Sequence, residues 1–204
     1  MRHYAYDVRV LCFDRCSFDY QARYCEDNVW RLLARGELKG RRAWAVIVAS
    51  PTDFFVALRQ RAGRSGDGFV CWDYHVFAVV HDPDDGRLAL DLDSTLSFPC
   101  PLEAYLAETF PPLRHPYGRP IFRVMPAADY LAGLVSDRSH MRKSDGSPSA
   151  PPPPWPAPGD GKRNTLMAWI DVTAKSPGVL CDLVGMMAFS MASNLSQVDF
   201  MDPL

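Results

Sequence analysis

Residues 69–93 read FVCWDYHVFAVV (69–80), HDPDDG (81–86) and RLALDLD (87–93). The first and last parts are strand candidates, bounded by turn residues. The middle part is typical of a turn, because Asp and Gly tolerate left-handed conformations and Pro fixes a bend. We therefore expect an antiparallel hairpin from 69–80 and 87–93.

The flanking sequence adds helices on both sides of this hairpin. An apolar stripe among charged residues predicts a helix over 25–35, and a continuous apolar run predicts a buried strand over 44–50. Residues 147–159 are rich in proline and cannot form regular ladders, so we expect an extended surface segment. The further expected elements are a loop over 59–68, helices over 101–110, 127–134, 165–172 and 179–193, and a strand over 121–125. This mixture predicts the α+β class and a single domain over 1–204.

Composition narrows the classes of function. The net charge of −2, from 22 basic and 24 acidic residues, does not favour binding to nucleic acid or to an anionic membrane. The apolar runs are far shorter than the ~20 residues of a membrane span, and the N-terminus does not resemble a secretory signal. Six widely spaced cysteines indicate free thiols in a reducing compartment. We expect no metal and no cofactor.

A cysteine at the beginning of a helix is a candidate nucleophile. Cys25 lies directly before Glu26 and Asp27 at the start of the predicted helix 25–35. The positive end of the helix dipole should favour the thiolate, which is the reactive form of the side chain. A cysteine in this position is alternatively a small buried hydrophobic residue.

The hairpin brings an imidazole to a carboxylate. Alternate residues of a strand share a face, so Cys71, Asp73 and His75 should line one side of 69–80. A turn centred on Pro83 places His75 opposite Asp91, and a turn centred on Asp84 places it opposite Asp93. Either pair is the orienting half of a catalytic triad, or a core histidine with a satisfied hydrogen bond.

Two further side chains are interpreted as structural. Trp72 should point away from His75 in an ideal strand and pack in the core. Asp137 and Arg138 should form a structural ion pair.

The chain order Cys, His, Asp on helix, strand and strand resembles the papain-like and transglutaminase-like cysteine enzymes. A closer resemblance is to the protein N-terminal glutamine amidohydrolase family. It rests on YCEDNVW (24–30), QRAGR (60–64) with WDYHV (72–76), DLDSTL (91–96) with FPCP (98–101), and SDRSHM (136–141). It spans roughly 24–170; Ala22 and Arg23 replace the family's usual Ser-Cys, and the tail from about 178 matches weakly.

This resemblance implies a function. Cys25, His75 and Asp91 would be nucleophile, base and orienting residue, which selects Asp91 over Asp93. The enzyme would hydrolyse the side-chain amide of an N-terminal glutamine to glutamate, releasing ammonia, without a cofactor or a metal. The family also implies a monomer of cytosol and nucleus that acts on proteins or peptides in the N-degron route.

Selectivity for a chain end requires a counter-charge for the substrate's α-ammonium group. Glu26, Asp27 and Asp73 are the candidate substrate-binding carboxylates, because they lie nearest the triad in sequence or strand position. The alternatives are a cysteine protease or transglutaminase-like acyl transferase, which would also accept internal residues, and a non-catalytic interaction module in which Cys25 is only packed.

Overall fold

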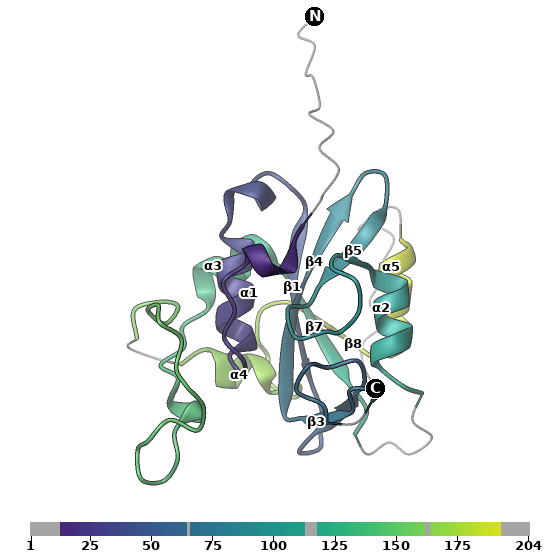
Figure 1. Ribbon diagram of the computed structural model, residues 1–204. Helices are drawn as coiled ribbons and strands as arrows, with labels where there is room; N and C mark the ends of the chain where they lie inside the picture. The colour runs from purple at the N-terminus through teal and green to yellow at the C-terminus, as the bar shows by residue number, and fades with distance from the viewer. Residues whose placement is uncertain (1–12, 65, 113–117, 162–163, 193–204) are drawn as a thin grey trace, which may run out of the picture.

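The computed structural model describes residues 13–64, 66–112, 118–161 and 164–192. Its centre is a six-stranded antiparallel sheet in the order β6-β5-β4-β1-β7-β8, and a second sheet pairs β2 with β3 (Figure 1). The strands are β1 Ala43–Ala49, β2 Phe55–Ala57, β3 Val70–Trp72, β4 Tyr74–Asp82, β5 Gly86–Leu90, β6 Cys100–Pro101, β7 Ile121–Pro126 and β8 Val179–Cys181. The α-helices are α1 Cys25–Leu33, α2 Leu102–Thr109, α3 Ala127–Gly133, α4 Leu166–Ile170 and α5 Leu183–Met191. The predicted α+β class is confirmed.

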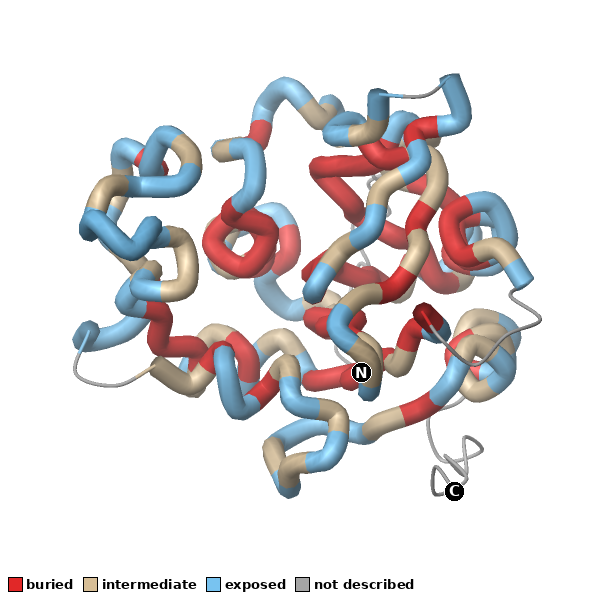
Figure 2. Tube along the Cα trace, turned by 90° about the horizontal axis from the view of Figure 1, so that it is seen from below, coloured by how far each residue is buried: buried red, intermediate tan, exposed pale blue. Residues whose placement is uncertain are grey.

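Helices cover both faces of the large sheet. Helices α1, α3 and α4 lie on one face, and α2 and α5 lie on the other (Figure 1). Alternate residues of the central strands therefore enter two separate cores. Ile47 of β1 packs toward the α1 face, whereas its neighbour Val48 packs toward the α2 face. Figure 2 shows the resulting buried strands between two layers of helix.

The predicted hairpin is present, with its turn centred on Asp84. Ala78 pairs with Leu90, and Asp82 pairs with Gly86, which takes a positive φ of 75° in the turn. The first strand is not continuous, however. It breaks at Asp73 into β3 and β4, which belong to different sheets. The predicted single strand over 69–80 was therefore wrong, and so was the shared face of Cys71, Asp73 and His75.

The second hairpin strand is shorter than predicted, and this shapes the site. β5 ends at Leu90, and 91–99 form a loop between β5 and β6. Residues 74–77 of β4 therefore have a ladder partner in β1 but none in β5. One edge of β4 is left open beside His75.

The C-terminal part contains one further correction. Residues 179–181 form β8, which pairs with β7, and only then does α5 begin. The predicted helix over 179–193 was thus too long at its start. Residues 147–159 contain no helix or strand, as predicted. Among the described residues, no helix is both long enough and apolar enough to cross a membrane.

Candidate active site

His75 and Asp91 form a buried pair at the open edge of β4. His75 Nε2 lies 3.1 Å from Asp91 Oδ1, and both side chains are 2% exposed. Burial lowers the pKa of the imidazole, but the interaction with the Asp91 carboxylate outweighs that effect and leaves the pKa raised, although the contact is too poorly directed to count as a hydrogen bond of Nε2. Burial likewise raises the pKa of the carboxyl, and the charge of His75 offsets it, so the pKa of Asp91 is lowered. This is the electrostatic arrangement of a carboxylate that stabilises an imidazolium.

Asp91 is held in place by several donors. Its Oδ1 accepts the Asp93 backbone N–H at 2.9 Å, and its Oδ2 accepts the Tyr105 hydroxyl at 2.9 Å and the Gln60 amide at 3.4 Å. Tyr105 lies on α2 and is buried, so its hydroxyl fixes the Asp91 carboxylate from the side of that helix. The second aspartate, Asp93, accepts the Tyr20 hydroxyl at 2.6 Å instead.

Trp72 contacts His75, contrary to the prediction. The two rings stack with centroids 5.9 Å apart and an interplanar angle of 12°, and the Trp72 indole N–H donates to Gln60 Oε1 at 3.3 Å. The break at Asp73 is the physical reason, because a bent chain no longer alternates as an ideal strand does. Gln60 thereby connects Trp72 to Asp91.

Cys25 begins α1 and reaches the edge of β4. It is 8% exposed, and its sulfur accepts a hydrogen bond from the backbone N–H of Val76, the residue after His75. The structure thus places Cys25 one residue along β4 from the His75–Asp91 pair. The Asn28 side chain fixes the approach to the helix, since it accepts from Gln21 N at 2.9 Å and donates to Gln21 O at 2.8 Å.

The electrostatic environment of Cys25 differs from the one predicted. Burial raises the pKa of its thiol well above the ordinary value, and the charge of Glu26 raises it further. The helix start was expected to favour the thiolate, but one helix dipole does not outweigh a desolvated site next to a carboxylate. These surroundings favour the neutral thiol over the thiolate.

Glu26 carries a buried carboxylate next to this thiol. The residue is 0% exposed, and its Oε2 lies 3.8 Å from Cys25 Sγ and accepts the Tyr74 hydroxyl at 2.9 Å. His140 Nε2 lies 3.3 Å from Oε1, but the geometry leaves Oε1 without a hydrogen bond. Oε1 therefore lacks a well-directed hydrogen bond and has the His140 imidazole as its ion-pair neighbour.

The other two candidate carboxylates have different surroundings. Asp27 is buried, and its Oδ2 pairs with Arg138 Nε at 2.8 Å. Arg138 also donates to the Trp155 carbonyl at 3.0 Å, so Asp27 ties the proline-rich segment to α1. The predicted pairing of Arg138 with Asp137 was wrong, because the Asp137 carboxylate accepts from Ser139 and Asn164 instead. Asp73 is exposed, and it caps the backbone N–H of Tyr74.

Comparison with known proteins places these residues in a family. The sequence profile described as N-terminal glutamine amidase matches residues 20–192, which include every candidate residue above. The chain belongs to the N-terminal glutamine amidase family. Two relatives named protein N-terminal glutamine amidohydrolase, from Drosophila pseudoobscura pseudoobscura and Drosophila ananassae, are each 44% identical to it, over 146 and 147 residues. In both cases the match covers 67% of this chain and 70% of the relative.

A metal is the other chemistry that this amidase-family site might accommodate. His75, Asp91 and Asp93 each offer a ligand atom, all within 4.8 Å of one another. Both carboxylates already accept hydrogen bonds from protein donors, Tyr105 on one and Tyr20 on the other. Hydrogen bonds of this kind orient a carboxylate whether it positions an imidazole or ligates a metal.

Several residues of this amidase-family site were not predicted from sequence. The site includes Gln60 and Tyr105 around Asp91, and Tyr74 and His140 around Glu26. Gln60, Tyr74 and His140 lie inside quoted family motifs, QRAGR, WDYHV and SDRSHM, so the resemblance offered a signal for them. Tyr105 had none, because only the packing of α2 against the sheet brings it to Asp91.

Proposed function

We propose that this protein hydrolyses the side-chain amide of an N-terminal glutamine to glutamate and ammonia. The observation that carries the proposal is the buried His75–Asp91 pair at the sheet edge that the thiol of Cys25 reaches. Family membership supplies the substrate class. With a nucleophile on a helix start and a base on a strand, we also assign the fold to the papain/transglutaminase-like cysteine hydrolases.

The chemistry proceeds through a thioester. His75 takes the proton of the neutral Cys25 thiol as the sulfur attacks the amide carbon. The same proton passes to the departing amine, so the C–N bond breaks and ammonia leaves. Water, deprotonated by His75, then hydrolyses the thioester and returns the thiol. The backbone N–H of Cys25 at the start of α1 is the proposed donor to the oxyanion.

Glu26 is the proposed partner of the substrate's α-ammonium group. Among Glu26, Asp27 and Asp73, it alone combines full burial with contact to Cys25 Sγ and an oxygen without a hydrogen bond. The α-nitrogen and the amide carbon of glutamine are about 5 Å apart when the side chain is extended. A glutamine that presents its amide to Cys25 can therefore also reach this carboxylate. Asp27 holds Arg138, and Asp73 is exposed and caps the backbone of Tyr74.

Three peptides test whether the protein recognises the free α-amine of its substrate. Acetylation of the α-amine should lower kcat/KM roughly a hundredfold or more, because a neutral amide cannot pair with a desolvated carboxylate. A peptide that starts with Asn should also lose about a hundredfold, since its amide carbon falls one methylene short. Ammonia release from equal concentrations of Gln-, acetyl-Gln- and Asn-started peptides measures both effects.

Two variants locate the carboxylate. Glu26→Gln should remove most of the preference for the free over the acetylated peptide, whereas Asp73→Asn should keep it. Similar rates for free and acetylated peptides in the unmodified protein would exclude an amine pocket and favour the protease or transglutaminase-like alternative. An internal glutamine would then be an equally good substrate.

The raised pKa of His75 predicts the acid limb of the pH profile. The mechanism requires a neutral imidazole, and a raised pKa keeps the ring protonated to a higher pH than 6.5, its ordinary value. kcat/KM should therefore rise with pH through a midpoint above 6.5. In Asp91→Asn the raising charge is gone and burial remains, so the midpoint should move to lower pH. An unchanged midpoint in that variant would assign the titration to another group.

From the family resemblance we also propose that the protein is a monomer, that it is located in cytosol and nucleus, and that it acts in the N-degron route. We propose no cofactor, because the thioester route needs none.

A further inference from the structure

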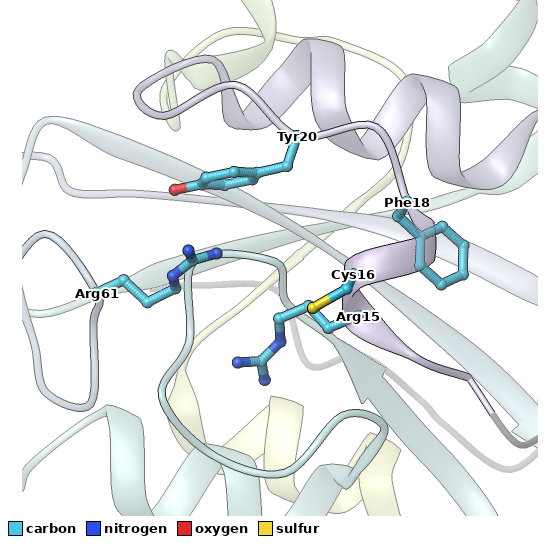
Figure 3. Close-up of a pocket in the computed structure, with 5 residues that line it drawn as sticks. All are labelled: Arg15, Cys16, Phe18, Tyr20 and Arg61. Carbon is cyan, nitrogen blue, oxygen red and sulfur yellow. The ribbon is translucent and has the colours of Figure 1, made fainter.

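A pocket beside the candidate active site contains two arginines that the mechanism does not use. It encloses about 440 Å³ and is lined by Arg15, Cys16, Phe18, Tyr20 and Arg61 (Figure 3). We call it the arginine pocket. Cys16 and Arg61 are exposed, so the pocket is open to solvent, and the buried Phe18 forms part of its lining.

The arginine pocket is built on the loop that carries the triad aspartate. The backbone N–H of Arg61 donates to the Asp93 carbonyl at 2.7 Å, and its guanidinium donates to the Leu92 carbonyl at 3.1 Å. The Tyr20 hydroxyl donates to Asp93 Oδ1, and Arg15 Nη2 donates to the Leu96 carbonyl at 2.6 Å. The loop 91–96 thus carries Asp91 and also accepts hydrogen bonds from three residues that line the pocket.

The charge of the arginine pocket is only partly neutralised, because Asp91 and Asp93 act on Arg15 through space and Arg61 acts on Asp93. Among the described residues, neither guanidinium forms an ion pair with a carboxylate, and Arg15 Nε is buried without a hydrogen-bond partner. Tyr20 donates to one oxygen of Asp93, a carboxylate that acts on both arginines through space. Two guanidiniums with free donors form a site for a planar anion, because the fork of N–H groups matches a carboxylate.

The guanidiniums are also held in position. The Arg61 guanidinium lies 4.6 Å from the centre of the Tyr20 ring, and that of Arg15 lies 5.2 Å from the centre of the Phe98 ring. Tyr20 itself belongs to the segment that Asn28 ties to α1. Ordering these long side chains on binding therefore costs less entropy than at an open surface.

We propose that the arginine pocket binds an acidic side chain of the substrate polypeptide, a few residues after the terminal glutamine. This inference rests on the proposed function. The reaction consumes only the terminal side chain, so the rest of the substrate must leave across the surface beside the triad. The arginine pocket adjoins that surface, and its volume exceeds the space that one carboxylate needs. The protein therefore prefers chains with Asp or Glu near the N-terminus.

A substrate scan tests the preference. Gln-started peptides carry Glu, or Gln as the neutral isostere, at each of positions 2 to 5. At one position, Glu should raise kcat/KM about three- to tenfold, mainly through KM, as expected for a partly exposed ion pair. The ratio between acidic and neutral peptide should fall to about one in Arg15→Gln and Arg61→Gln. It should persist in Arg59→Gln, whose guanidinium pairs with Glu108 at 2.8 Å.

Thiol labelling gives a readout that does not depend on turnover. Cys16 lines the pocket and Cys71 is an exposed thiol outside it, so Cys71 is an internal reference. In the Cys25→Ala protein, the preferred acidic peptide should slow alkylation of Cys16 relative to Cys71 at least threefold, and the neutral peptide should not. Peptide mapping by mass spectrometry measures both sites. If no peptide releases ammonia from the unmodified protein, the proposed function fails while this labelling result still stands.

Three outcomes would overturn the inference. One is equal kcat/KM for acidic and neutral peptides at every position. Another is a preference that survives both arginine variants, which would place the acidic side chain elsewhere. The third is protection of Cys16 by inorganic phosphate but by no acidic peptide, which would make the pocket a site for small anions.

Discussion

Replacement of Cys25 by alanine is expected to abolish ammonia release from Gln-started peptides. The thioester route has no substitute for the sulfur, and loss of a covalent nucleophile costs roughly a millionfold in kcat in well-studied hydrolases. The fold should survive, because a small side chain replaces another at a site that is 8% exposed. Continuous ammonia detection, with circular dichroism and thermal unfolding of both proteins, measures the two effects separately.

Cys181→Ala is the matched control for this prediction. Cys181 is also buried, but it lies on β8 and packs in the core on the α2 face of the sheet. The control should lose some thermal stability and keep its kcat. Substantial ammonia release by Cys25→Ala would refute the thioester mechanism, and a folded, inactive Cys181→Ala would show that the assay reports packing rather than chemistry.

The local architecture around the hairpin was predictable from sequence because it depends on local chemistry. The Asp-Pro-Asp-Asp-Gly turn fixed the pairing of β4 with β5, and the beginning of α1 at Cys25 matched its predicted position. Both features depend on residues that are neighbours along the chain. Patterns of apolar and polar residues over short stretches of sequence also distinguished the antiparallel hairpin from the flanking helices.

The alternation of residues along a strand was not sufficient to decide whether Asp91 or Asp93 contacts His75. A turn centred on Asp84, extended as an ideal ladder, would place Asp93 opposite His75. The ladder ends at Leu90, however, and the bonds from Asp93 N and Tyr105 to Asp91 turn that side chain to the imidazole. Only the family resemblance selected Asp91 in advance, because the strand end has no clear local signal.

The surroundings of the proposed triad depend on contacts between residues that are distant in sequence. Tyr74 meets His140 across 66 positions, and Asp27 meets Arg138 across 111. No hydrophobic period encodes such pairs, since each forms only after α1 and the segment after α3 have packed on the sheet. The same reason explains why Arg138 was paired with its neighbour Asp137 in the prediction. Polar side chains follow the tertiary fold more than their position in the chain.

Asp91→Asn should lower kcat by roughly a thousandfold or more, because an amide can donate to His75 Nε2 and so stabilise the wrong tautomer of the base. Asp93→Asn should cost far less. Burial raises the pKa of the Asp93 carboxyl, and its Oδ1 is occupied by Tyr20, so it acts on His75 only as a nearby charge.

Asp85→Asn, in the exposed turn of the same hairpin, is the control and should be fully active. Steady-state ammonia release by the three purified proteins, compared at the pH optimum of each, gives the order. Equal losses at 91 and 93, or the reverse order, would assign the orienting role to Asp93 and would mean that the 3.1 Å contact between His75 and Asp91 is not the one that catalysis uses.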